Sequence, residues 1–537
     1  MESKERSTKF NIMAIILIMV FCFAVTPITL QNDTFYTIKI GEHIMENGID
    51  MKDPFSWHEN MDYTYPHWAY DTGIYLIYNT FGQTGIYIST IILSMLLGIV
   101  IYLASRKFTK NNIVSFVLTI GAIYMLKNYI AARAQLPTFI LFALTIYFIE
   151  MFLETRKKRY GIGLVVIPIL IANLHVAVFP FYFILYLPYI GEYILYLIGN
   201  SGIALNKYKL KKLQKNVGVD ILGDPNIEKI QNRIETLTKR KQKSQENPYK
   251  VIITKKENTK YLIIIMIICL LAGLVTPLGT TPYTYLYKTM TGETTNNINE
   301  HLPLVLINNI NLICALIFFF AILMFTDTKI RLCDLFMFAG LLILTIYSKR
   351  QESMFVIGCV FILARLISAM FEKYDPEGCG KLEKIATKLS GQIVTIALIL
   401  IIATISYKPK MGNKYINEKD YPVEAAEYIL NNLDINNIKL YNEYNYGSYL
   451  LYKGIPVFID SRADLYAPEF NENITVFKDF IDMSGLNITN IEEKLNEYGI
   501  THLIMYSNAK LKMFIDQTPD KYNELYNDGQ FCIYERI

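Results

Sequence analysis

The chain has 537 residues, of which 52% are hydrophobic and only 19% are charged, and its mean hydropathy is +0.26. Such a composition excludes a water-soluble globule and indicates many membrane spans joined to a polar remainder. The formal net charge is only +4, so the placement of the charges is more informative than their sum.

Apolar runs of membrane-spanning length recur up to residue 407. The basic start MESKERSTK precedes an apolar run over 10–30. We interpret this run as an uncleaved first span, because no small-residue cleavage site follows it. Further spans are expected at 73–104, 111–130, 136–154, 160–180, 181–199, 261–278, 304–326, 332–348, 352–371 and 389–407. The total is about eleven, which defines an α-helical polytopic membrane domain over 1–407.

The basic loops indicate the orientation of this domain. Lysine and arginine recur in loops that fall on one side, at 4–9, 106–110, 156–159, 329–331 and 381–388. The positive-inside rule makes that side cytoplasmic. The N-terminus is then cytoplasmic. An odd number of spans in the cell membrane places the C-terminal part outside, on the same side as the loop that follows the first span.

That loop, 32–71, is long and chemically dense. Long ordered loops are usually functional. Its acids, histidines and tryptophans are Asp33, Glu42, His43, Glu46, Asp50, Asp53, Trp57, His58, Glu59, Asp62, His67, Trp68 and Asp71. Acids and imidazoles beside a bilayer, with aromatic rings at the level of the headgroups, suit a site that handles the polar group of a lipid carrier. The alternative is an interfacial loop whose acids are merely solvated.

A basic insertion is expected at 200–260, with fifteen lysines and arginines against six acids. The run IEKIQNRIETLTKRKQK predicts a helix, and another part of the insertion is expected to be disordered. A basic cytoplasmic segment next to a membrane attracts anionic headgroups. No nucleic-acid motif accompanies the charge, so nucleic acid is not an expected partner, and no catalytic role is assigned here.

From 408 to 537 the composition becomes that of a small extracytoplasmic α/β domain. YPVEAAEYILNNL and YGSYLLYKG predict helices, and IKLYN, PVFIDS, THLIMYS and FCIYERI predict strands. Two helical stretches are expected before THLIMYS and one near 509–526. Asp460, Arg462 and Asp464 follow a predicted strand, where α/β sheets often place binding residues. An Asp–Arg pair that orders the loop is an equal alternative.

Several polar residues lie near the outer ends of predicted spans, where charge is costly and often functional. They are Arg133, Gln135, Asn173, His175, Glu300, His301, Lys349 and Arg350. The functional interpretation is that the cations hold a phosphate, which the planar fork of arginine suits. The alternatives are snorkelling of the long cations to the interface and a helix–helix hydrogen bond from His175.

The order of these motifs resembles the GT-C superfamily of membrane glycosyltransferases, and within it a bacterial branch. The motifs are Asn32-Asp33-Thr34-Phe35-Tyr36, Ile40-Gly41-Glu42, Asp53-Pro54-Phe55-Ser56, Trp68 to Asp71, Arg133-Ala134-Gln135-Leu136, Asn173-Leu174-His175, Thr276-Pro277-Leu278-Gly279, Asn299-Glu300-His301-Leu302-Pro303, Arg350 before Phe355, and VFIDSRADLY. Each motif is weak alone, but their order along one chain is fairly specific.

The chain departs from this pattern at three positions. Relatives often have an acid where His67 stands, proline where Ala134 stands and tryptophan where His301 stands. No clean Asp-x-Asp motif is present either. No cofactor is therefore expected, and a requirement for a divalent metal, although not excluded, is not supported.

The resemblance implies inverting transfer of a sugar from a polyprenyl-phosphate carrier to an acceptor hydroxyl on the extracytoplasmic face. It makes Asp33 the first candidate for general base and Asp71 the second. Arg133 and Arg350 are the candidates to stabilise the leaving phosphate. Gln135, Lys349, His67, Trp68, His175 and Glu300 complete the expected substrate-binding set. The expected partners are a lipid-linked sugar, the membrane and an acceptor that is a glycan, a lipid or a protein.

Two alternatives from other functional classes stay open. One is a transporter or flippase of lipid-linked sugars, against which the chain shows no clear internal repeat and no paired broken helices. The other is a non-catalytic cell-envelope assembly protein with the same fold, for which His67 is the best argument. Convergence of the acids and arginines on one outward-facing cavity favours the enzyme, whereas a polar path to both faces favours a transporter.

Overall fold

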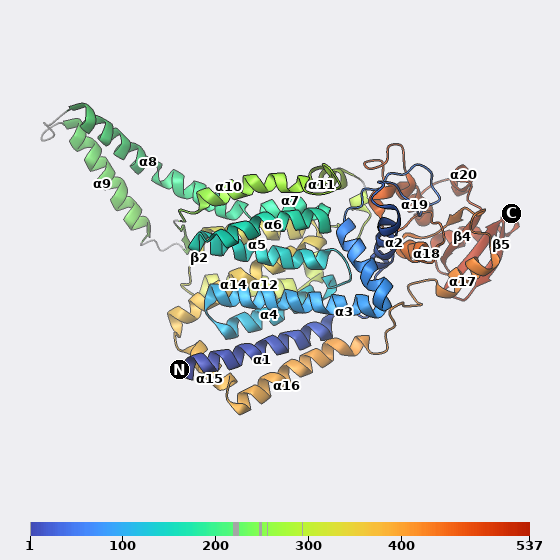
Figure 1. Cartoon of the computed structure of the whole chain (residues 1–537), viewed down its shortest axis with the longest axis horizontal. Coiled ribbons are helices and arrows are strands. Elements are labelled where there is room, and N and C mark those ends of the chain that lie inside the picture. The colour runs from blue at the N-terminus through green and yellow to red at the C-terminus, as the bar shows by residue number, and fades with distance from the viewer. Residues whose placement is uncertain (1, 218–224, 246–249, 255, 293) are drawn as a thin grey trace.

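The computed structural model describes residues 2–217, 225–245, 250–254, 256–292 and 294–537. It has two regions, a bundle of long helices and a smaller mixed region formed by the C-terminal residues (Figure 1). The N-terminus lies at the end of the bundle that faces away from the C-terminal region.

The helices of the bundle form from the apolar runs of the sequence. They are α1 (Glu2–Val25), α3 (Trp68–Thr109), α4 (Asn112–Leu126), α5 (Gln135–Thr155), α6 (Lys158–Leu174), α7 (Phe179–Ile184), α8 (Leu187–Val217), α10 (Thr259–Cys269), α12 (Ile310–Phe325), α13 (Leu332–Tyr347), α14 (Glu352–Tyr374) and α16 (Leu389–Tyr407). Among the described residues, six helical stretches are long and apolar enough to cross a membrane. Three further apolar stretches are shorter. The membrane class is thus supported, while the count of about eleven spans is not confirmed.

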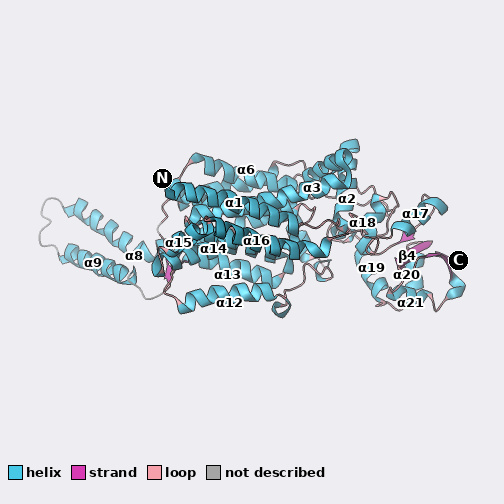
Figure 2. Cartoon of the chain, turned by 90° about the horizontal axis from the view of Figure 1, so that it is seen from below, coloured by secondary structure: helices cyan, strands magenta, loops and turns pink. Residues whose placement is uncertain are grey.

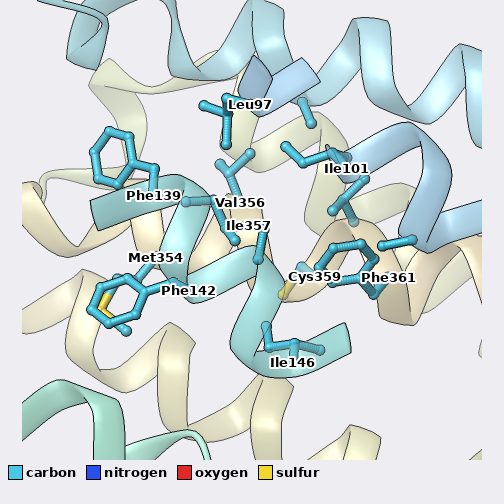
Figure 3. Packing of buried hydrophobic residues seen from close by; sticks show 14 of the residues in the cluster. Leu97, Ile101, Phe139, Phe142, Ile146, Met354, Val356, Ile357, Cys359 and Phe361 are labelled. Atoms are coloured by element: carbon cyan, nitrogen blue, oxygen red, sulfur yellow. The ribbon is translucent and has the colours of Figure 1, made fainter. Parts of the chain in front are cut away.

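The centre of the bundle lies between α3, α5 and α14. Leu97 of α3, Phe142 of α5 and Ile357 of α14 are at most 2% exposed and belong to one packed cluster (Figure 3). Lipid tails are as apolar as these side chains, so close fit between helices, more than exclusion of water, holds such a core together in a membrane. This rigid core carries the residues at its C-terminal-domain end in fixed positions.

Charged side chains are buried at the opposite end of the bundle, near the strand pair β1 (Val251–Ile252) and β2 (Ile330–Arg331). Glu150 accepts hydrogen bonds from Arg331 at 2.6 and 3.1 Å and from Lys256 at 3.1 Å. Asp334 accepts from Arg331 at 2.7 Å and also from Arg365. The sequence showed Arg331 only as a loop charge, because its partner Glu150 is 181 positions away in the chain.

The segment expected as one long loop begins with a helix, α2 (Asn32–Asn47). Its first turn contains Asp33, where a carboxylate is favourable near the helix N-terminus. The helix ends at Gly48, whose φ of 81° is easily adopted only by glycine. Residues 48–67 then run along the C-terminal region, where the Trp57 indole N–H donates to the Leu440 carbonyl at 3.0 Å.

The predicted basic insertion does not begin at a helix boundary. The helix α8 continues from its apolar part into the basic part, and α9 (Pro225–Gln245) packs against it, so the two helices project from the bundle (Figures 1 and 2). The helix predicted from IEKIQNRIETLTKRKQK is confirmed as α9. Part of the stretch expected to be disordered lies outside the described residues.

The C-terminal region is a small α/β domain. Its helices are α17 (Val423–Asn432), α18 (Tyr444–Tyr452), α19 (Val476–Gly485), α20 (Ile491–Glu497) and α21 (Lys510–Ile515), and its strands are β3 (Leu440–Tyr441), β4 (His502–Tyr506), β5 (Tyr522–Asn527) and β6 (Phe531–Arg536). The sheet order is β3-β4-β6-β5, with β3 parallel to β4 and the other pairs antiparallel. Two further helices, α11 (Thr281–Thr291) and α15 (Gly378–Ala386), lie between bundle helices in the sequence.

Two secondary-structure predictions for this domain were wrong. PVFIDS is not a strand of the sheet, because Val457 instead forms an isolated parallel bridge with Ser56 of the first segment. The helix predicted near 509–526 stops at Ile515, and its second half is strand β5. In both cases a tertiary partner decides the conformation, which local propensity does not reveal.

The first segment and the C-terminal domain share one hydrophobic core. The ring of Phe35 in α2 packs 5.0 and 5.3 Å from the rings of Tyr421 and Tyr449. This shared core fixes the domain against α2, and thereby against the end of the bundle where the candidate site lies.

Candidate functional site

A cavity of about 1320 Å³ lies between one end of the bundle and the C-terminal domain. Its walls come from α2, the start of α5, the loop before α12, the start of α14, and residues near α18 and 461–465. Of the residues predicted for the site, those that line the cavity are Asp33, His67, Arg133, Gln135, His175, Glu300 and Arg350. The structure therefore brings together residues that are up to several hundred positions apart in the chain.

Arg133 stands between two carboxylates of this cavity. It makes an ion pair with Asp33, and its Nη1 donates to Glu300 Oε1 at 2.9 Å. Burial alone would lower the pKa of Arg133, but the two carboxylates raise it above its ordinary value. Burial likewise opposes ionisation of Glu300, yet Arg133 and Arg350 hold its pKa below the ordinary value. Arg133 and Glu300 are therefore both charged at neutral pH.

Arg350 is the second arginine of the cavity, and it is held by Gln135. With the amide oxygen of Gln135 turned toward it, Arg350 donates from Nε and Nη2 at 2.7 and 2.8 Å. The backbone N–H of Arg350 also donates to the Glu300 carbonyl at 3.0 Å, which ties the loop before α12 to the start of α14. Gln135 is neutral, so the positive charge of Arg350 stays available to an anion in the cavity.

Three predicted residues do not line the cavity. Asp71 is fully buried, and its Oδ2 lies 3.4 Å from His67 Nδ1. The Trp68 indole donates to Asn173 Oδ1 at 3.1 Å, and Lys349 Nζ donates to Asn299 Oδ1 at 2.7 Å. Asp71 therefore does not reach the cavity, whereas its neighbour His67 lines it, and Trp68 and Lys349 support neighbouring segments.

Two of the three histidines that line the cavity, His67 and His175, lie side by side, with ring centroids 5.7 Å apart. The buried His175 follows directly on α6, and its Nδ1 lies 3.2 Å from the Thr138 hydroxyl. His67 precedes the first turn of α3, four residues before Asp71. The helix–helix contact that was the alternative for His175 is present, and the residue also faces the cavity.

The run that contains Asp460, Arg462 and Asp464 divides into two parts. Arg462 donates to Asp460 Oδ2 at 2.6 Å and to Asp53 Oδ1 at 2.7 Å, with all three side chains almost completely buried. This is the loop-ordering pair, and it also docks the first segment onto the domain. Asp464 takes no part in this pair; it lines the cavity, as Arg462 also does, and accepts a hydrogen bond from the Tyr285 hydroxyl.

The residues that sequence reasoning missed are mostly aromatic or come from the C-terminal domain. Tyr36, Tyr285, Glu443 and Tyr444 all line the cavity. A chain with 40 tyrosines gives no signal that selects these three. Glu443 lies two residues after strand β3, and the rule that sheets bear binding residues at strand ends would have selected it.

Within the described residues, no group of three or more histidine, cysteine, aspartate or glutamate side chains is arranged to hold a metal ion. The cavity carboxylates Asp33 and Glu300 share Arg133 as their cationic partner.

Among the solved structures, the chain is similar to the oligosaccharyltransferase of Archaeoglobus fulgidus in its apo form. The TM-score is 0.51, the identity is 10%, and the similarity covers 93% of this chain and 69% of the other. No protein-family model and no curated protein matches the chain. At this identity the likeness shows a similar fold alone, and it does not single out a bacterial branch.

Proposed function

We propose that the chain is a membrane glycosyltransferase that moves a sugar from a polyprenyl-phosphate carrier to an acceptor hydroxyl, with inversion. The observation that carries this proposal is the convergence of Asp33, Arg133, Glu300 and Arg350 on one cavity beside the membrane bundle. A carboxylate to receive a proton and an arginine to receive a phosphate are the two groups that such a transfer requires. The similarity to an oligosaccharyltransferase fold supports the same class.

The proposed step uses few protein groups. The acceptor oxygen attacks the anomeric carbon of the donor sugar while its proton passes to the Asp33 carboxylate. The bond between the anomeric carbon and the phosphate oxygen breaks, and the lipid phosphate leaves with the electron pair. Arg350 stabilises the negative charge of this leaving group. A positioned base contributes about 10²–10⁴-fold to such a rate, and removal of one charge-stabilising donor costs about 10²–10³-fold.

The remaining predicted residues take supporting roles in this proposal. Arg133 holds the Asp33 carboxylate in place, and Glu300 holds Arg133 from the other side. Gln135 orients Arg350. Asp71 orients His67, which contacts substrate together with His175. The side chains of this scheme can act without a metal ion. The transfer assay is therefore run with and without a divalent cation.

The proposed topology places the cavity on the extracytoplasmic side of the cell membrane. It retains about eleven spans with a cytoplasmic N-terminus. In support, the N-terminus, β2, α9 and α15 all lie at the end of the bundle remote from the C-terminal domain (Figure 1). These elements belong to the basic segments of the sequence, and positive charge on one side of the membrane predicts the cytoplasmic side.

The cavity also favours an enzyme over a transporter. A transporter needs a polar path that reaches both faces of the membrane. Among the described residues, the charges at the opposite end of the bundle are bound to one another in the cluster of Glu150, Arg331, Asp334 and Arg365 and do not line this cavity.

The decisive experiment is a transfer assay with the full-length protein in detergent and a panel of polyprenyl-phosphate sugars. Release of the carrier phosphate reports the reaction. Asp33→Asn should reduce the rate by at least about 10²-fold, because the amide cannot accept the proton. The matched control is Glu46→Gln, an exposed acid on the same helix, which should retain the wild-type rate. Full activity of Asp33→Asn would remove Asp33 from the mechanism, and absence of transfer with every sugar would refute the proposed function.

A further inference from the structure

The wall of the cavity that the C-terminal domain supplies differs chemically from the wall that the bundle supplies. Glu443 and Tyr444, at the start of α18, line it together with Asp464 and Phe470. All four side chains are half-buried, so each has surface left for a ligand. The bundle side, in contrast, presents the cations Arg133 and Arg350.

The two carboxyl groups of this wall lack a cationic partner. Burial raises the pKa of Glu443 to about 7, and its only hydrogen bond among the described residues comes from the Tyr506 backbone N–H at 3.4 Å. Burial also raises the pKa of Asp464, against the effects of the Tyr285 hydroxyl and Arg350. Within the described part of the chain, neither carboxyl makes an ion pair with lysine or arginine.

The cations near this wall are either paired with acids or exposed to solvent. Arg462 reaches the cavity, but Asp460 and Asp53 already neutralise it. Lys510 is exposed at the rim. An anionic ligand would therefore meet two carboxyl groups without a free arginine on this side. A hydroxyl-bearing neutral ligand could both donate to and accept from these groups.

Aromatic rings lie next to the carboxyl groups. Tyr444 directly follows Glu443, and the ring of Phe470 packs 5.1 Å from that of Tyr285, the residue that donates to Asp464. Carboxyl groups that bind hydroxyls, beside aromatic rings that pack against the apolar face of a pyranose, are the combination that sugar ligands require. A pocket with a few placed polar groups among aromatic surfaces is the general form of such a site.

This wall is close to the proposed base. The Asn32 side-chain amide donates to the Tyr444 backbone carbonyl at 3.0 Å, and Asn32 immediately precedes Asp33. The start of α18 and the start of α2 therefore meet, and a ligand held along Glu443 and Tyr444 lies beside the Asp33 carboxylate.

We infer that Glu443, Tyr444, Asp464 and Phe470 form the acceptor subsite, and that the acceptor is an uncharged glycan. This inference rests on the proposed function, because it assigns the second substrate of the same reaction. Glu443 and Asp464 hydrogen-bond the hydroxyls of the acceptor sugar, and the two rings pack against its apolar face. The acceptor hydroxyl is thereby presented to Asp33.

A binding experiment without donor tests the inference independently of catalysis. The full-length protein in detergent is titrated against fluorescently labelled neutral hexose oligosaccharides and against uronate-containing oligosaccharides of the same length. We expect binding of at least one neutral member and none of the acidic set. Glu443→Gln and Asp464→Asn should each weaken that binding by about tenfold, because each removes a hydrogen bond between a carboxyl oxygen of the protein and a hydroxyl of the glycan.

Two controls separate the possible failures. Glu472→Gln, an exposed acid of the same domain outside the cavity, should bind like the wild type. Asp33→Asn should retain glycan binding while losing transfer. Absence of binding by all neutral glycans, equal binding of the acidic set, or wild-type binding by both subsite variants with unchanged melting temperatures would overturn the inference. Glycan binding without transfer would refute the proposed function and leave the subsite standing.

Discussion

At the C-terminal-domain end of the molecule, two triplets share one arrangement, an arginine between two carboxylates. Asp53, Arg462 and Asp460 form the closed triplet, in which the side chain of Arg462 is 2% exposed and both acids are 0% exposed. Asp33, Arg133 and Glu300 form the open triplet, with 18%, 23% and 49% exposed. The closed triplet joins the first segment to the C-terminal domain, whereas the open triplet lines the cavity. The same arrangement of charges therefore docks two segments where it is buried, and remains accessible to a ligand where water reaches it.

The largest predicted effect on stability concerns the closed triplet. Arg462→Met leaves two carboxylates buried without their partner, which should lower the free energy of unfolding by about 3–5 kcal/mol. The measurement is denaturation of the full-length protein, followed by the fluorescence of Trp57, whose indole is bound to the domain. The triple variant Asp53→Asn, Arg462→Met, Asp460→Asn should recover much of the loss, because no charge is then buried. Unchanged stability of Arg462→Met would show that the triplet does not dock the segment.

The open triplet should respond in activity more than in stability. Arg133→Met releases Asp33, so transfer should fall by about 10²–10³-fold. The unfolding free energy should fall by only about 1–2 kcal/mol, because water still reaches the remaining carboxylates. Carrier release and denaturation of the same preparation measure both quantities. If Arg133→Met destabilised the protein as much as Arg462→Met while the folded fraction kept full activity, the difference between the two triplets would disappear.

The sequence predicted the members of the open triplet but not those of the closed one as a set. Asp33, Arg133 and Glu300 each stand at the end of an apolar run, where a charge is conspicuous and the faces of a bundle restrict its neighbours. Asp53 and Arg462 lie in polar segments, where charges are ordinary, and the pairing of segments 409 positions apart leaves no local pattern. The same limit explains the wrong strand at PVFIDS, whose partner is Ser56 and not a neighbouring strand.

The sequence predicted where most helices lie, but it did not predict the environment of several residues. Apolar runs of about twenty residues predict helices with little ambiguity, which gave α5, α14 and α16 to within a few residues. The helix α2 was missed because its mixed composition resembles a polar loop. Asp71 was predicted to be a candidate base from its place at the start of a span, but side-chain direction on α3 buries it behind His67. The rotation of α3 about its axis is set by its packing against Gly41 and the rest of α2. Such packing is a tertiary property, which the local sequence does not reveal.

The smallest predicted effect compares two buried carboxyl groups whose pKa values shift in opposite directions. Burial opposes ionisation of Asp53, but Arg462 lowers its pKa below the ordinary value. Burial of Glu443 raises its pKa from 4.5 to about 7 with no arginine to oppose it. Asp53 therefore stabilises the fold above its unfolded-state pKa, and that contribution is lost as the pH falls through its lowered pKa. Glu443 has the opposite sign, because between pH 4.5 and about 7 the folded state retains a proton that the unfolded state has lost.

Stability should therefore decline by about 1–2 kcal/mol as the pH rises through this window, the amount being reduced by water in the cavity. Glu443→Gln removes the titrating group, so the melting temperature of the variant, relative to that of the wild type, should increase between pH 5 and pH 8. A constant difference across that range would mean that Glu443 is already ionised in the folded state. The Glu443 carboxylate would then be stabilised by a cation or by water. The proposed acceptor wall would be charged, like the open triplet, and not neutral.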